Sequence, residues 1–190
     1  SNKGRLPQGA GFFISRTHMS ASSVQTLARS FPPVANEAAH TLILGSVPGQ
    51  ASLAAQQYYA HPRNAFWPML AELLGFAVDL PYSAKIERLQ QAGIALWDVL
   101  YSCQRPGSLD SSIRSSSVIA NDLPGFLQAH PAIRRVFFNG ASAENYFRRH
   151  VAPDMPASTI VFLRLPSTSP AHASLCFAQK LAAWRCLIDG

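Results

Sequence analysis

The sequence contains few charged residues: only 14% of its 190 residues are Asp, Glu, Lys or Arg, while 48% are hydrophobic. This composition excludes an intrinsically disordered chain, because disorder requires little hydrophobic and much charged sequence. The sequence also lacks an apolar run long enough to span a membrane, and no stretch near residue 1 has the charged, apolar and small-residue order of a secretory signal. We therefore expect a cytoplasmic globular protein that does not insert into membranes.

Cysteine is scarce as well. The three cysteines, Cys103, Cys176 and Cys186, are widely spaced and odd in number. Such a set fits neither a disulfide framework nor the spacing of a zinc or four-cysteine iron–sulfur site. We expect all three to be reduced thiols without a metal.

Acidic residues are outnumbered by basic ones, 10 against 16, which gives a net charge of +6 and an isoelectric point near 9.7. In a chain with so few charges, this excess favours a polyanionic partner such as nucleic acid. A surface that is basic without any such partner is the alternative explanation, and charge alone does not separate the two.

The hydrophobic pattern is typical of an α/β protein. Short apolar runs at 41–46, 94–103, 133–140 and 158–167 predict four buried strands, and amphipathic stretches at 66–75, 83–93 and 141–150 predict helices between them. Apolar strands alternating with helices indicate a parallel sheet covered on both faces. Ligands of such sheets bind beyond the carboxyl ends of the strands, so we expect the site in the segments that follow the strands.

The domain organisation is simple. Residues 1–29 have weak periodicity, and the His18-Met19 pair is typical of a cloning scar or an alternative start. We therefore interpret 1–29 as an N-terminal arm that is in part a tag or that contains an alternative start. Residues 30–190 contain neither an internal repeat nor a linker, and we expect them to form one domain.

The stretch "YYAHPRNAFW" (58–67), which follows the first predicted strand, crowds aromatic and polar groups together. Asn64 lies near Tyr59 and Phe66, so a flat aromatic face stands beside a neutral amide. A pocket for a planar heterocycle needs these two features. The competing explanation is structural: Asn64 would cap the helix that follows, and the aromatic side chains, Trp67 above all, would belong to the core.

The stretch "LPSTSPAHAS" (165–174) follows the last predicted strand and supplies hydroxyl groups and a histidine just before a helix. Hydroxyl and backbone N–H groups at such a position suit phosphate oxygens. A serine- and proline-rich turn with a helix cap is the alternative.

Four stretches together resemble the uracil-DNA glycosylase superfamily, and within it the hypoxanthine-DNA (deoxyinosine) glycosylase family. They are "LILGSVPGQASLAAQQYYAHPRNAFW", "LWDVLYSCQRPGSLDSSI", "FFNGASAENYF" and "LPSTSPAHAS", in the order found in that family. The resemblance implies a three-layer α/β/α sandwich with a central four-stranded parallel sheet. It also implies hydrolysis of the N-glycosidic bond of a flipped, deaminated base in DNA, with no metal and no cofactor.

The same resemblance implies roles for individual residues. The first motif of the superfamily often carries an Asp or Asn that positions the attacking water, but this sequence has Val47 there. The hypoxanthine branch similarly lacks that group and uses the Asn of its "HPRN" stretch, which here is Asn64. We therefore expect Asn64 to be the catalytic residue that orients water.

The expected base-binding residues lie between the first two strands and at the end of the second. Phe66 takes the place of an aromatic residue that stacks on the extruded base, and Tyr59 is a second candidate for this contact. Asp98 falls near the position that reads the base edge, where relatives usually have Asn. The base-binding set is Gly45, Ser46, Tyr59, Phe66 and Asp98.

The last motif of the relatives reads His-Pro-Ser-Pro, whereas this sequence places its histidine later, at His172. We expect the loop around it to contact the DNA backbone and to enter the minor groove. The expected DNA-binding residues are Ser167, Thr168, Ser169 and His172.

The resulting hypothesis is a monomeric, monofunctional DNA glycosylase of base excision repair whose substrate is DNA containing a deaminated base, above all hypoxanthine. No lysine lies in the four motifs, so we expect no Schiff base and no strand cleavage. One alternative is a mismatch-specific uracil/thymine-DNA glycosylase, although that branch normally has Asn at the position of Val47. The other is a non-catalytic nucleic-acid-binding module on the same fold.

Overall fold

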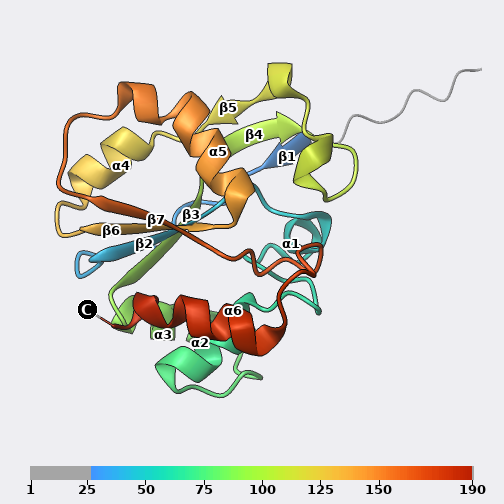
Figure 1. Ribbon diagram of the computed structural model, residues 1–190, viewed down its shortest axis with the longest axis vertical. Helices are drawn as coiled ribbons and strands as arrows, with labels where there is room; N and C mark the ends of the chain where they lie inside the picture. Colours follow the sequence, from blue (N-terminus) through green and yellow to red (C-terminus); the bar gives the residue numbers. More distant parts are fainter. Residues whose placement is uncertain (1–26, 190) are drawn as a thin grey trace, which may run out of the picture.

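The fold is built on four parallel strands that lie in the order β3-β2-β6-β7 (Figure 1). The computed structural model describes residues 27–189. The strands are β2 (Thr41–Gly45), β3 (Ile94–Asp98), β6 (Arg135–Asn139) and β7 (Val161–Leu165). Each falls within one of the four apolar runs of the sequence, so the predicted parallel sheet is confirmed.

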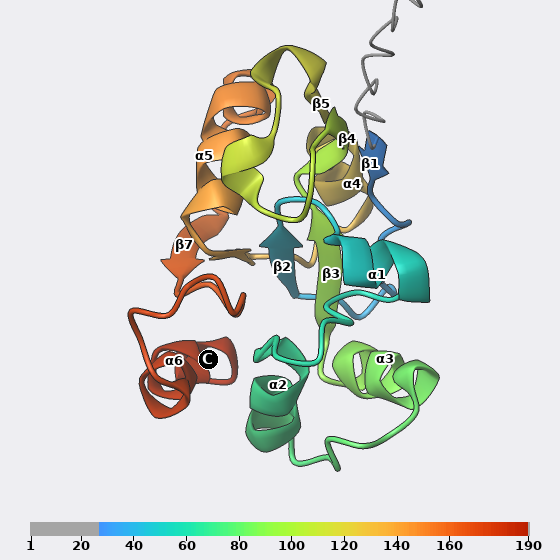
Figure 2. The same cartoon turned by 90° about the vertical axis from the view of Figure 1, so that its right-hand side faces the viewer.

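Alternate residues of β2, β3 and β6 belong to two separate hydrophobic cores, whereas all residues of β7 except Leu165 are exposed. Leu42 and Phe138 belong to the core under α4 (Leu123–Ala129) and α5 (Ala141–His150). Ile43 and Phe137 belong to the core under α2 (Phe66–Leu74), α3 (Tyr82–Gln91) and α6 (Phe177–Trp184). This split follows from the period of two along a strand. Figures 1 and 2 show the helices on the two faces of the sheet, which confirms the three-layer α/β/α arrangement.

Six helices are described: α1 (Gln50–Ala55), α2 (Phe66–Leu74), α3 (Tyr82–Gln91), α4 (Leu123–Ala129), α5 (Ala141–His150) and α6 (Phe177–Trp184). Asp122 caps α4, because its carboxylate accepts the N–H of Gly125 at 2.9 Å. Pro81 is the N-cap residue of α3.

The apolar run 94–103 is not one strand, as its composition predicts, but two. β3 ends at Asp98 and β4 (Leu100–Gln104) begins after Val99 in a second, antiparallel sheet with the order β1-β4-β5. The N–H groups of Val99 and Leu100 donate to the carbonyls of Gly45 and Ser46. The bend therefore fastens the end of β3 to the turn that follows β2.

The small sheet also includes the end of the expected N-terminal arm. β1 (Leu27–Arg29) pairs with β4, and β5 (Ile119–Ala120) pairs with the other edge of β4. Residues 27–29 thus pack onto the domain, whereas 1–26, including the His18-Met19 pair, lie outside the described residues.

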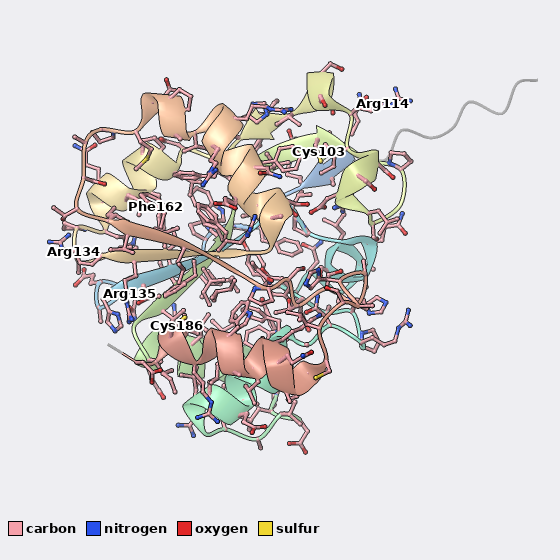
Figure 3. The ribbon with its side chains drawn as sticks, viewed as in Figure 1. Cys103, Arg114, Arg134, Arg135, Phe162 and Cys186 are labelled. Atoms are coloured by element: carbon pink, nitrogen blue, oxygen red, sulfur yellow. The ribbon has the colours of Figure 1, made fainter. Side chains whose placement is uncertain are left out.

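The cysteines are free thiols, as predicted: Cys103 is buried, Cys176 exposed and Cys186 intermediate. Figure 3 shows Cys103 and Cys186 on opposite sides of the four-stranded sheet. Within residues 27–189, no helix is long and apolar enough to cross a membrane.

Candidate active site

A cavity of about 640 Å³ opens where the carboxyl ends of the parallel strands meet. The last residues of β2, β3 and β6 line it, together with the loop that follows β7, and Figure 1 shows this loop and α1 beyond the same end of the sheet. Of the expected site residues, all but Phe66 line this cavity: Gly45, Ser46, Tyr59, Asn64, Asp98, Ser167, Thr168, Ser169 and His172. The sheet topology thus brings together residues that are far apart in the sequence.

The aromatic wall of the cavity is Tyr59. Its ring stacks on that of Phe66, with 3.9 Å between the ring centroids and 23° between the planes. Phe66 is fully buried behind Tyr59 and also contacts Trp184 edge-on, so its ring lies in the core instead of on the cavity wall. Trp67 is buried too, as expected, and its indole N–H donates to the carbonyl of Tyr58.

Tyr59 has an unusual backbone conformation. Its φ is +55°, in the left-handed region that bulky residues rarely adopt. The neighbouring peptides are held in place, because the Ala60 N–H donates to the hydroxyl of Ser52 and the Tyr58 N–H donates to the hydroxyl of Tyr82. Such strain persists only where the surrounding structure over-determines it, and it is concentrated at functional sites.

Asn64 precedes Ala65, which is the N-cap of α2, so the alternative that Asn64 is the N-cap residue is wrong. Its Oδ1 nevertheless accepts the backbone N–H of Phe66, the first residue of the helix, at 3.0 Å. The same side chain is half-buried and lines the cavity. The hydrogen bond holds the amide in one orientation at the edge of the cavity, and an amide so held is suited to orient a ligand or a water molecule.

Asp98 lies at the bottom of the site and is 3% exposed. Burial raises the pKa of its carboxyl to about 7, although the Ser30 hydroxyl, 3.4 Å away, donates a hydrogen bond that favours the ionised form. A Cβ on Gly45 would collide with Asp98 Oδ1 and would lie 2.9 Å from Tyr59 Oη. Gly45 is therefore required so that both polar groups can approach the end of β2.

The loop after β7 is fastened to the end of β6 through Asn139. The Asn139 side chain donates to the hydroxyl of Thr168 and accepts the Thr168 backbone N–H, both at 2.9 Å. Thr168 is 1% exposed, so its hydroxyl is engaged inside the protein, while Ser167, Ser169 and His172 are half-buried. Asn139 is not among the site residues that the sequence predicts. The signal that could have identified it is its position at the end of a strand.

An ion pair between the buried Arg105 and the half-buried Asp110 holds the turn after β2. Arg105, 2% exposed, donates to the carbonyl of Pro48 and, at 3.2 Å, to Asp110, whose other oxygen accepts the hydroxyl of Ser46 at 2.6 Å. Arg105 and Asp110 also line the cavity. Sequence reasoning missed this pair, because it lies in a polar stretch that the pattern assigns to a loop. The only signal was a pair of opposite charges directly after an apolar strand.

The comparison with known families is decisive. The profile of the uracil DNA glycosylase superfamily matches residues 32–187 of the chain. The chain belongs to this superfamily. The predicted family and the predicted class of enzyme, a DNA glycosylase, are therefore confirmed.

The chain is similar to two curated proteins and to one solved structure. A hypoxanthine DNA glycosylase of Methanosarcina acetivorans is 39% identical over 119 residues, which cover 62% of this chain and 74% of that protein. A hypoxanthine DNA glycosylase of Methanosarcina barkeri is 35% identical over a segment with the same coverage. The solution NMR structure of a candidate uracil DNA glycosylase from Methanosarcina acetivorans has a TM-score of 0.68 and 32% identity, covering 85% of this chain and 99% of that one.

Val47 occupies the place where members of the superfamily often carry Asp or Asn. Its side chain is 7% exposed and packs into the core under α4 and α5. An apolar side chain so placed offers water no hydrogen bond. Among residues 27–189, no group of three or more His, Cys, Asp or Glu side chains is arranged to hold a metal ion.

Proposed function

We propose that this DNA glycosylase hydrolyses the N-glycosidic bond of a deaminated base extruded from DNA, that hypoxanthine is its preferred base, and that it acts as a monomer. The observation that carries the proposal is the cavity itself. It combines an aromatic face at Tyr59, an amide at Asn64 and a buried carboxyl at Asp98, in a volume of about 640 Å³ that is typical of small-ligand sites. The names of the two archaeal relatives support the choice of hypoxanthine.

The base would be held flat against Tyr59. Stacking of a base on an aromatic ring is worth about 1–3 kcal/mol and is the usual way to retain an unstacked nucleotide. Phe66 supports this face from behind through its own stacking on Tyr59, so its contribution to base binding is indirect. Asp98, with a pKa raised to about 7, would read the base edge in either protonation state near neutral pH, as a donor or as an acceptor.

Asn64 would orient the attacking water toward the sugar carbon. An amide is too weak a base to remove a proton early in the reaction. This limitation costs little if the bond to the base loosens first, because an oxocarbenium-like sugar reacts readily with water. Backbone N–H groups of the turn after β2, which Arg105 and Asp110 hold in place, would stabilise the departing anionic base.

The loop after β7 would contact the DNA backbone beside the cavity. Ser167, Ser169 and His172 line the mouth of the site, and Thr168 fixes the loop to Asn139. The net charge of +6 favours attraction to phosphates, so binding should weaken steeply as the salt concentration rises.

The arrangement of lysines supports simple hydrolysis without strand cleavage. No lysine is found among the described residues that line the cavity. Lys180 is buried beneath the loop after β7 and donates to the carbonyls of Ser169 and His172. Its amine therefore holds the loop and is not available to form a Schiff base with the sugar.

The test uses duplex and single-stranded oligonucleotides that carry deoxyinosine, deoxyuridine, deoxyxanthosine or a G·T mismatch, with detection of the free base. The proposal predicts release of hypoxanthine and an intact abasic strand. Release of uracil or thymine with no release of hypoxanthine would favour the mismatch-specific branch. Binding without release of any base would indicate a non-catalytic module.

A further inference from the structure

Lys180 is a buried amine that no acid neutralises. It is the fourth residue of α6, and only 6% of it is exposed. None of the ion pairs formed within residues 27–189 includes Lys180. Burial lowers the pKa of the amine, and among the same residues no carboxylate opposes this effect. A charge is costly to bury unless it is paired, so the position of Lys180 calls for a function that offsets the cost.

The amine contacts the loop after β7, and Figure 2 shows α6 next to this loop. Lys180 Nζ donates to the carbonyl of His172 at 2.7 Å and to the carbonyl of Ser169 at 3.4 Å. The same two residues close a turn, because the His172 N–H donates to the Ser169 carbonyl at 3.0 Å. Asn139 already holds the loop through Thr168, so the loop is fixed at two points.

The contacts within the loop do not explain why this residue is charged. Two carbonyls need only a neutral donor, such as an amide. Ser167, Ser169 and His172 line the cavity, whereas Lys180 does not and lies behind the loop. A phosphate bound to the loop would be separated from the ammonium mainly by backbone. Charges that are partly buried are screened by salt much less than exposed ones, so the attraction between the two would persist at moderate salt.

We infer that Lys180 is a positioning residue for a DNA phosphate: it sets the turn between Ser169 and His172, and the phosphate that binds this turn supplies the countercharge that residues 27–189 do not provide. This inference rests on the proposed function, in which the loop after β7 contacts the DNA backbone. Lys180 does not line the cavity and therefore contacts neither the base nor the sugar carbon. It acts on the affinity for DNA more than on the rate of bond cleavage.

The first experiment is Lys180→Gln, which removes the charge and keeps a neutral donor for the two carbonyls. The Kd for a deoxyinosine duplex should rise by about 3- to 10-fold, and the plot of log Kd against log salt should lose about one unit of slope. Most of the loss should appear in the protein concentration that gives the half-maximal single-turnover rate, and not in the maximal rate. Lys180→Arg keeps the charge and should restore both the Kd and the slope. Lys85→Gln is the matched control, because it removes the same charge from α3 at a residue that does not line the cavity.

A lysine that serves only the fold would give a different result. Lys180→Gln would then lower the melting temperature, and the folded variant would bind DNA with the wild-type Kd and salt slope. This outcome would overturn the inference and leave the proposed function standing. An affinity of the wild type for DNA that does not depend on salt would overturn both.

The second experiment uses the wild-type protein and follows the pKa of the Lys180 amine by NMR of carbon-labelled lysine. The pKa should rise when the deoxyinosine duplex binds, because a phosphate nearby favours the charged form. Each phosphate beside the deoxyinosine is then replaced in turn by a neutral methylphosphonate, and one of these duplexes should leave the pKa as it is in the free protein. The same pKa with and without the natural duplex, or an equal rise with every modified duplex, would overturn the inference.

Discussion

Replacing Asn64 by Ala should have two effects of different size, one on stability and one on catalysis. The Oδ1 atom of Asn64 accepts the backbone N–H of Phe66 at 3.0 Å, so the change removes one hydrogen bond at the start of α2. Loss of one such hydrogen bond costs about 1 kcal/mol of folding free energy. For a chain of 190 residues, this corresponds to a decrease of about 2–4 °C in melting temperature.

The effect on catalysis should be much larger. Val47 is apolar and buried, so it cannot take over the orientation of water when Asn64 is lost. Positioned groups of this kind contribute about 100-fold or more to the rate, and we expect the excision rate to fall by at least that factor. The assay is single-turnover release of hypoxanthine with enzyme in excess, at a temperature well below the melting of the variant.

The control is a variant that loses a comparable hydrogen bond at the start of another helix. Asp122→Ala removes the cap of α4, where the carboxylate accepts the Gly125 N–H at 2.9 Å, and Asp122 does not line the cavity. Asp122→Ala should lose a similar amount of stability and keep its excision rate. The reasoning is refuted if Asn64→Ala also excises at the wild-type rate per folded molecule, because the role of Asn64 would then be structural only.

Three further predictions concern residues that line the cavity. Gly45→Ala should lower excision by about 100-fold with little change in affinity for undamaged DNA, because the new Cβ collides with Asp98 and displaces the groups that contact the base. Burial raises the folded-state pKa of Asp98 from 3.8 to about 7, so the contribution of Asp98 to stability is present at low pH and is lost as the pH rises through 7. Asp98→Asn should remove this pH-dependent loss of stability. Thermal melts of the wild type and the variant between about pH 4 and 9 would show the difference. Asp110→Ala removes the partner of the buried Arg105 and should cost about 1–3 kcal/mol in denaturant unfolding, with a smaller loss if Arg105→Met is combined with it.

The fold could be predicted from the sequence because its dominant signal is local. Each parallel strand is a short, nearly continuous apolar run, and amphipathic helices lie between the runs. The break at Val99 could not be predicted, because β3 and β4 are both apolar and the change of sheet leaves no mark in the hydrophobic pattern. What fixes the break is hydrogen bonding of Val99 and Leu100 to the turn after β2, which is a tertiary contact.

The candidate site was predictable to the extent that its residues follow strands. Asn64 and Tyr59 lie in the segment that follows β2, Asp98 is the last residue of β3, and the structure gathers all three around one cavity. The burial of Phe66 was not predictable, because two aromatic residues near the start of a helix give no indication of which ring faces the core. The pairing of Arg105 with the Pro48 carbonyl was equally hidden, since it joins two loops that only the folded sheet brings together.

The most direct test of the central claim is the identity of the base that the purified protein releases from a deoxyinosine duplex. Our account predicts free hypoxanthine in a single-turnover reaction without added metal or cofactor, an abasic strand that stays intact until it is treated with alkali, and a rate at least about 100-fold lower for Asn64→Ala. A wild-type protein that binds this duplex and releases no hypoxanthine, or an Asn64→Ala variant that releases it at the wild-type rate, would contradict the account.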